Sequence, residues 1–214
     1  DSNKGLLTTV GIDINGKPCY AIEGSVFIGG AVIQWLRDGL EILKNASDSD
    51  SIANSIDSND GVYIVPAFTG LGTPYWNMDA RGLITGITRG TNRKHLVRAS
   101  LESIAYQVHD IINSIKIDMN IDISTLKVDG GATQNDFLMQ FQSDILESTI
   151  ERPKNIESTS IGAALLAGLG TNFWSIDDIR LFRVIDREFK PTLNKSERKL
   201  LIKGWIKAIN KTIH

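Results

Sequence analysis

The chain has 214 residues, of which 42% are hydrophobic, and its formal charge at pH 7 is −2. This composition allows a packed core, and the absence of a basic stripe argues against a nucleic-acid partner. Apolar runs are too short for a membrane span, no signal peptide is visible, and the single Cys19 suits a reducing compartment. We therefore expect a cytoplasmic protein with no membrane partner. Three scattered histidines and one cysteine give no zinc-type spacing, so no metal site is expected in the chain.

The first part of the chain predicts a β-hairpin followed by a helix. Residues 6–12 and 19–22 have strand character and flank Asn15-Gly16, a dipeptide typical of hairpin turns. A helix is expected over residues 29–45, and its apolar positions at helical spacing are Val32, Ile33, Leu36, Leu40 and Leu43. The Ser/Asp/Asn-rich residues 46–60 indicate a solvated loop or a short surface helix.

The middle of the chain predicts two short strands, a long loop and a long helix. Residues 61–66 and 83–87 are strand-like, and we expect the aromatic side chains of the glycine-rich loop between them to anchor it to the core. An unbroken helical period predicts a helix from about Arg93 to Met119. Glu102 and His109 lie in this helix and are expected to be solvated.

The last part alternates strands with helices, which is typical of the α/β class. Strands are expected over residues 148–153 and 183–189. Helices are expected over residues 161–168, 176–181 and from 195 to the C-terminus. The helix over 161–168 is built mostly of small residues, which would let it pack closely against a neighbour.

Between these parts, residues 126–141 combine a strand, a glycine pair and a helix start. Leu126 and Val128 alternate with polar residues and predict a buried strand. Gly130 and Gly131 then remove two Cβ atoms where the chain turns. Such a turn is a common ligand platform at the edge of an α/β sheet, but a plain tight turn explains the glycines equally well.

Several familiar motifs are missing. The sequence has no GxxxxGK[ST] phosphate loop, no GxGxxG fingerprint and no GxSxG elbow. These absences disfavour a P-loop ATPase, a dinucleotide dehydrogenase and a serine hydrolase. No catalytic residue is assigned within the chain.

Three segments, in one order, resemble the FGGY carbohydrate kinases. Residues 61–76, GVYIVPAFTGLGTPYW, resemble the characteristic loop of the glycerol kinases in that family. Residues 82–102 resemble the second family signature, and residues 128–144 resemble the adenosine segment. The resemblance extends from about Gly5 to Trp205.

The resemblance implies an actin-like ATPase (ribonuclease H-like) α/β domain with a mixed sheet flanked by helices. Residues 1–214 would form the C-terminal, nucleotide-binding domain of a two-domain kinase. The motifs imply nucleotide contacts by Gly131 and Asn135, and by Gly30 and Gln34, with Gly130 as a weaker candidate. Gly30 and Gln34 are four positions apart and would share one helix face. Without the family pattern, Gln34 would be expected to be solvated.

The resemblance also implies a reaction. The intact protein would use ATP and Mg2+, transfer the γ-phosphoryl group to glycerol to give glycerol 3-phosphate, and form a homo-oligomer. The family's catalytic aspartate, glycerol contacts and phosphate segments would lie before Asp1, so this chain should hold adenosine weakly and not phosphorylate glycerol alone. The absence of an initial Met also suggests a piece of a longer protein. Another FGGY sugar kinase, or a non-catalytic interaction module of the same fold, stays open as an alternative.

Overall fold

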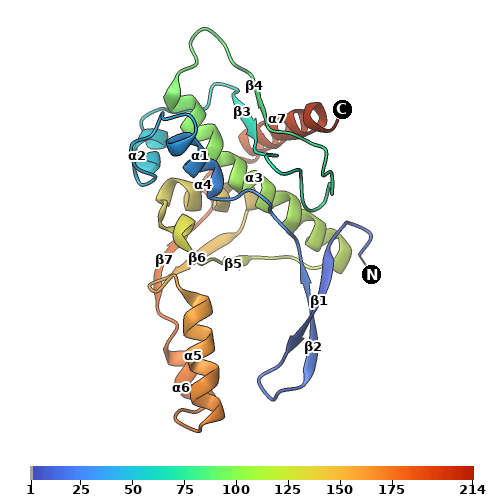
Figure 1. Cartoon of the computed structure of the whole chain (residues 1–214), viewed down its shortest axis with the longest axis vertical. Helices are drawn as coiled ribbons and strands as arrows, with labels where there is room; N and C mark the ends of the chain where they lie inside the picture. The colour runs from blue at the N-terminus through green and yellow to red at the C-terminus, as the bar shows by residue number, and fades with distance from the viewer. Residues whose placement is uncertain (1) are drawn as a thin grey trace.

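The structure, a computed structural model, describes residues 2–214, apart from the side chain of Arg180. Its strands form three small sheets, with the orders β1-β2, β3-β4 and β5-β6-β7 (Figure 1). The helices α1 to α4 and α7 surround the buried core, and α5 and α6 extend away from it (Figure 1). This arrangement confirms the α/β class predicted from the sequence.

The predicted hairpin is confirmed. Strand β1 (Leu7–Ile12) pairs antiparallel with β2 (Pro18–Glu23). In the turn, the Asp13 carboxylate accepts the N–H groups of Asn15 and Lys17, each at 2.8 Å, and Gly16 has a φ of +78°. The hairpin projects from the helices (Figure 1). Large side chains on it, such as that of Tyr20, are exposed.

The sheet that carries the glycine turn is mixed, as predicted. Strand β5 (Thr125–Lys127) is parallel to β6 (Thr149–Pro153), which is antiparallel to β7 (Ile185–Phe189). The prediction of a buried strand was too strong, because Leu126 and Val128 are only half-buried. They pack against the core from one side, while the residues that alternate with them face solvent.

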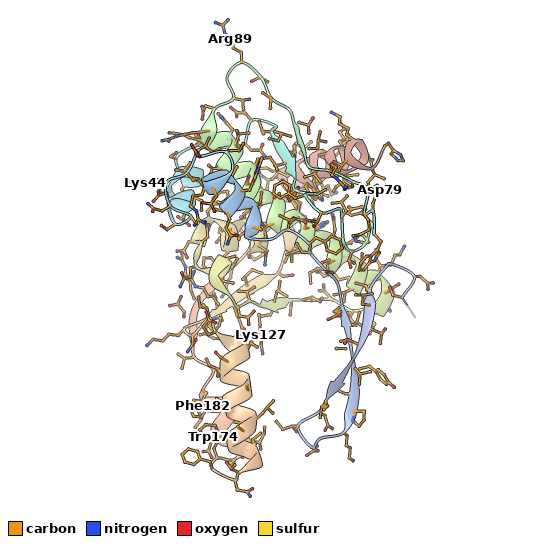
Figure 2. The ribbon with its side chains drawn as sticks, viewed as in Figure 1. Lys44, Asp79, Arg89, Lys127, Trp174 and Phe182 are labelled. Carbon is orange, nitrogen blue, oxygen red and sulfur yellow. The ribbon has the colours of Figure 1, made fainter. Side chains whose placement is uncertain are left out.

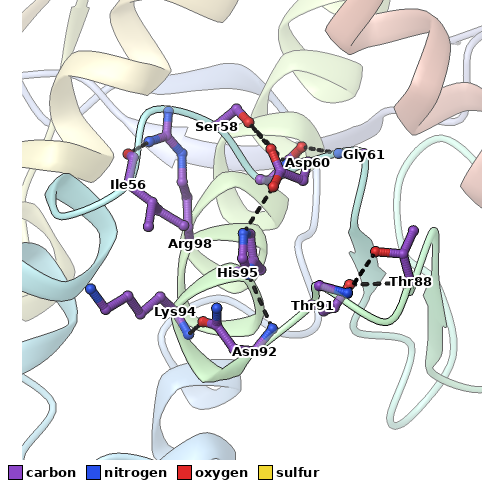
Figure 3. Close-up of polar contacts among 12 residues, drawn as sticks. Ile56, Ser58, Asp60, Gly61, Thr88, Thr91, Asn92, Lys94, His95 and Arg98 are labelled. Carbon is purple, nitrogen blue, oxygen red and sulfur yellow. Dashed lines mark hydrogen bonds and ion pairs between the residues drawn. The ribbon is translucent and has the colours of Figure 1, made fainter.

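The long helix α3 (Arg93–Met119) has the predicted ends. It begins at a capping box, in which the Asn92 side chain accepts the Lys94 N–H at 2.9 Å and the Asn92 N–H is donated to His95 Nδ1 at 3.1 Å (Figure 3). Both bonds satisfy N–H groups that a helix start leaves without partners. Helix α3 then crosses the whole core (Figure 1).

The aromatic loop is anchored, as expected. It joins β3 (Tyr63–Val65) to β4 (Leu83–Thr85), which pair antiparallel. The Tyr75 hydroxyl donates to Asp110 Oδ2 at 2.8 Å, and the Trp76 indole donates to the carbonyl of Gly5 at 2.6 Å. The loop is therefore tied both to α3 and to the segment before the hairpin.

Helix α1 (Ala31–Asp38) is shorter than the predicted helix over residues 29–45. The N–H groups of Gly39 and Leu40 both bond to the carbonyl of Trp35, and Glu41 takes a φ of +55°, which turns the chain away from the helix axis. A side chain at Gly39 would also meet the Trp35 ring at 2.7 Å. As a result Leu40 is exposed, although it continues the apolar period of the sequence.

Helix α2 (Asp48–Asn54) confirms the short-helix alternative for residues 46–60, but this segment is not simply solvated. Ser49 is 2% exposed and Ala53 is fully buried against the core. Helix α2 therefore forms part of the packed domain.

Helix α6 (Ile176–Leu181) has the predicted bounds, and α5 (Ser158–Gly170) includes the predicted residues 161–168 but is longer at both ends. The close packing expected for the small residues of α5 occurs at Gly168, where a Cβ would lie 2.0 Å from the Trp174 ring. Trp174 in turn contacts Phe182, with ring centroids 5.4 Å apart (Figure 2). Most other residues of α5 are half-buried or exposed.

Helix α4 (Asp136–Leu146) and helix α7 (Lys195–Ile213) complete the core, as predicted. Trp205 of α7 is fully buried, stacks on Tyr106 of α3 with ring centroids 5.2 Å apart, and donates its indole N–H to Asp110 Oδ2 at 2.8 Å. One side chain thus joins the C-terminal helix to α3.

We predict that Trp205→Ala lowers the free energy of unfolding by about 3 to 5 kcal/mol, because it leaves a cavity and removes one of the two hydrogen bonds that Asp110 Oδ2 accepts. Leu200→Ala, on the same helix but 69% exposed, is the matched control and should cost less than about 0.5 kcal/mol. Denaturant unfolding of both variants measures the difference. Equal losses would contradict this role of Trp205.

Candidate functional site

Four of the five predicted site residues line one pocket of about 680 Å³. Gly30 and Gln34 come from the start of α1, and Gly131 and Asn135 come from the 3-10 turn η1 (Gly131–Gln134) and the residue after it. The pocket lies in the size range of small-molecule sites. The structure thus brings together two pairs of residues that are far apart in the sequence.

The two glycines in the pocket leave open space. A Cβ built on Gly30 would meet only the Cβ of Ala132, at 4.0 Å, and one built on Gly131 would meet nothing within 4 Å. A flat ligand could therefore approach the backbone at both positions.

Gly130, unlike Gly30 and Gly131, contributes to the backbone turn and not to the pocket surface. It does not line the pocket, and its φ of +86° with a ψ of 167° is a conformation that favours glycine. Its N–H donates to the carbonyl of Ile156 at 2.9 Å. Gly130 thus shapes the turn that carries Gly131 to the pocket.

The Asn135 side chain is held at both ends. Its Oδ1 accepts the N–H of Leu138 at 2.8 Å, which caps α4, and its Nδ2 donates to Ser49 Oγ of α2 at 3.1 Å. Gln34, in contrast, is exposed on its helix and free to turn toward a ligand.

Helix α2 and the residues before it form a wall of the pocket that sequence reasoning missed. This wall comprises Ala46, Ser47, Ser49 and Asp50. The composition of the segment pointed to solvent, and nothing in a single sequence shows that Ser49 meets Asn135, 86 positions away. Ile33, Leu101, Ile104 and Leu138 give the pocket an apolar floor, and Arg37 and Gln134 add a charged and a polar side chain to its lining.

The described residues, 2–214, contain no group of three or more His, Cys, Asp or Glu side chains able to hold a metal ion. In the same range, no helix has both the length and the hydropathy needed to cross a membrane.

The C-terminal domain of the FGGY family of carbohydrate kinases matches residues 1–171. The chain belongs to this family. A glycerol kinase from Clostridium botulinum (strain 657 / Type Ba4) is 51% identical over 214 residues, which is 100% of this chain and 43% of that protein. A glycerol kinase from Streptococcus pneumoniae (strain 70585) is 52% identical over 212 residues, 99% of this chain and 42% of that protein. The FGGY chain thus spans less than half the length of these relatives.

Solved structures agree with the family assignment. The crystal structure of Plasmodium falciparum glycerol kinase with ADP matches with a TM-score of 0.90 and 40% identity, over 100% of this chain and 43% of that one. A gluconate kinase from Lactobacillus acidophilus matches with a TM-score of 0.74 at 22% identity, over 98% of this chain and 45% of that one, and so shows the fold alone. These matches confirm the predicted actin-like ATPase fold.

In α3 of the FGGY domain, near Leu101, which lines the pocket, Arg98 and Glu102 form a mostly buried ion pair, with Nε and Oε1 2.9 Å apart. Glu102 is 2% exposed, so the prediction that it is solvated was wrong. Its other oxygen accepts an N–H from Asn59, which reaches it from the segment after α2. His109 is likewise half-buried rather than solvated, beside Asp110.

The surroundings of Glu102 alter its titration. Burial raises the pKa of its carboxyl from 4.5 to about 7, although Arg98 and Asn59 oppose the rise. The folded state therefore keeps this proton at pH values where the unfolded chain has released it.

We predict that Glu102 makes the free energy of unfolding fall as the pH rises from 4.5 to about 7, with a slope of at most about 1.4 kcal/mol per pH unit. The sign follows because the folded state binds more protons in this window, so stability is full below 4.5 and lost above 7. Glu102→Gln removes this slope, which denaturant unfolding at several pH values measures. Glu147→Gln, in the more exposed Glu147–Arg198 pair, is the control and should keep it. Parallel curves for wild type and Glu102→Gln would contradict the assignment.

Proposed function

We propose that this chain, residues 1–214, is the C-terminal, nucleotide-binding domain of a glycerol kinase. The observation that carries the proposal is the single pocket that gathers Gly30 and Gln34 with Gly131 and Asn135. The similarity to a glycerol kinase crystallised with ADP, at 40% identity, supports a nucleotide as the ligand.

The pocket suits the adenosine part of ATP. Gly30 and Gly131 present bare backbone to a flat base, and Ile33 and Leu138 supply buried apolar surface beneath it. The Gln34 and Asn135 amides are polar groups that could orient the nucleoside by hydrogen bonds. These chemical features match a nucleoside, which combines a flat base with hydrogen-bonding groups, better than a purely apolar ligand.

In the proposed reaction, the longer protein transfers the γ-phosphoryl group of ATP to a hydroxyl of glycerol, which gives glycerol 3-phosphate and ADP. Mg2+ would neutralise charge on the phosphates, and we assign it no ligand among the described residues. The contribution of this chain is to bind and orient the nucleoside end of ATP. We further propose that glycerol is bound by other parts of the longer protein, and that this protein is a cytoplasmic homo-oligomer.

We favour glycerol over a sugar as the substrate because the 51% identical relative from Clostridium botulinum is a glycerol kinase. The gluconate and xylulose kinases that share the fold are only 22% and 21% identical. Coupled assays of the full-length protein with glycerol, xylulose and gluconate test the choice. A higher kcat/KM with either sugar substrate than with glycerol would refute it.

We predict that Gly30→Leu in the full-length protein weakens ADP binding at least about tenfold, or ~1.4 kcal/mol, because the side chain fills the pocket. The α-helical backbone at Gly30 accepts a side chain, so the melting temperature should not fall. Calorimetry with ADP measures the affinity.

Gly29→Leu is the matched control for this experiment. Gly29 also has open space around it but does not line the pocket, so the substitution should leave ADP affinity unchanged. If Gly30→Leu bound ADP as tightly as Gly29→Leu, the pocket would not be the nucleotide site. If the wild type bound no ADP, a non-catalytic module of the same fold would be favoured.

A further inference from the structure

We propose that Ser49 is a positioning residue for nucleotide binding, which sets the orientation of the Asn135 amide from the neighbouring helix. This inference rests on the proposed function of the pocket. Both residues line it, and Ser49 lies in the part of the wall that the sequence did not reveal.

The direction of the Ser49 hydroxyl is set by its surroundings. Ser49 is 2% exposed, and its Oγ donates its only hydrogen to the carbonyl of Ala46 at 2.6 Å. Toward Asn135, 3.1 Å away, the same oxygen can therefore act only as an acceptor. The group that faces Ser49 has to be the amide nitrogen.

The other end of the amide gives the same orientation. Asn135 Oδ1 accepts the N–H of Leu138 at 2.8 Å. A flipped amide would set Oδ1 against the Ser49 oxygen and Nδ2 against the Leu138 N–H, so both hydrogen bonds would be lost. Ser49 and the start of α4 together hold a single orientation.

This orientation determines what Asn135 offers to a ligand. Its carbonyl oxygen is engaged in capping α4, whereas Nδ2 carries a second hydrogen, for which the described residues provide no hydrogen-bond partner. Asn135 therefore presents a donor to the pocket. The matching ligand atom is an acceptor, either a ring nitrogen of the base or an oxygen of the ribose.

Helix α2 is held firmly enough for Ser49 to act in this way. Asp50, next to Ser49, accepts the N–H of Phe137 at 2.9 Å. Beyond the end of α2, the Arg98 guanidinium donates to the carbonyl of Ile56 (Figure 3). It also lies over the Phe137 ring, 5.0 Å from the ring centroid. Contacts to α3 and α4 thus fix both ends of the segment that carries Ser49.

The test measures ADP affinity and melting temperature for Ser49→Ala, Asn135→Ala and the double variant of the full-length protein. Loss of one hydrogen bond predicts binding weakened about 2- to 12-fold by Ser49→Ala. In the Asn135→Ala background, Ser49→Ala should cause no further loss, because Ser49 acts through the Asn135 amide. Ser51→Ala is the control: Ser51 is exposed on the same helix and bonds only to the carbonyl of Asp48.

Ser49→Cys provides a second variant that keeps the side-chain shape, with a somewhat larger atom at the end, but offers a weaker acceptor. Ser49→Cys should also reduce ADP affinity, and it replaces Ser49→Ala in the test if that variant is too unstable to measure. Wild-type affinity in the folded Ser49 variants, or an equal loss in both Asn135 backgrounds, would overturn the role of Ser49 and leave the proposed function intact. Failure of the wild type to bind ADP would overturn the proposed function, and this role with it.

Discussion

The packing of α2, α3 and α4 depends on the contacts of one group, the Arg98 guanidinium. It is a mostly buried charge, with 15% of the side chain exposed, so it needs partners to replace water. The Glu102 carboxyl group and the carbonyls of Ala53 and Ile56 accept hydrogen bonds from it, and the Phe137 ring covers one face. Because these partners belong to three helical segments, satisfying one cation brings α2, α3 and α4 together.

Local patterns were sufficient to predict most elements. The full extent of α3 follows from one unbroken apolar period and an Asn cap, and the hairpin follows from two strand-like runs around Asn15-Gly16. The end of α1 could not be predicted in the same way. Leu40 and Leu43 continue the helical period, but the chain leaves the helix at Gly39 and turns at Glu41. The left-handed backbone conformation of Glu41 ends the helical path although the hydrophobic pattern continues.

The candidate site, too, could be predicted only in part from the sequence. Its residues were named by likeness to a family, since physical reasoning alone left Gln34 as a solvated side chain, and it is indeed exposed. The structure also separates the roles of the two glycines, which neither physical reasoning nor the family likeness did. Gly130 allows the backbone turn, whereas Gly131 leaves open space in the pocket. The burial of Glu102 escaped prediction because its partner Asn59 lies 43 positions away. Contacts between residues so far apart in the sequence produce no periodic pattern that a single sequence could show.

The projecting hairpin should open locally without unfolding of the rest of the domain. Val10, Ile12 and Tyr20 are 71%, 76% and 77% exposed, so folding β1 against β2 buries little apolar surface. An isolated two-stranded ribbon is marginally stable in water, and its opening costs far less free energy than global unfolding. The amides of β1 and β2 should therefore exchange with deuterium while those in the middle of α3 remain protected. In thermodynamic terms, the ribbon is a separate cooperative unit attached to a more stable one.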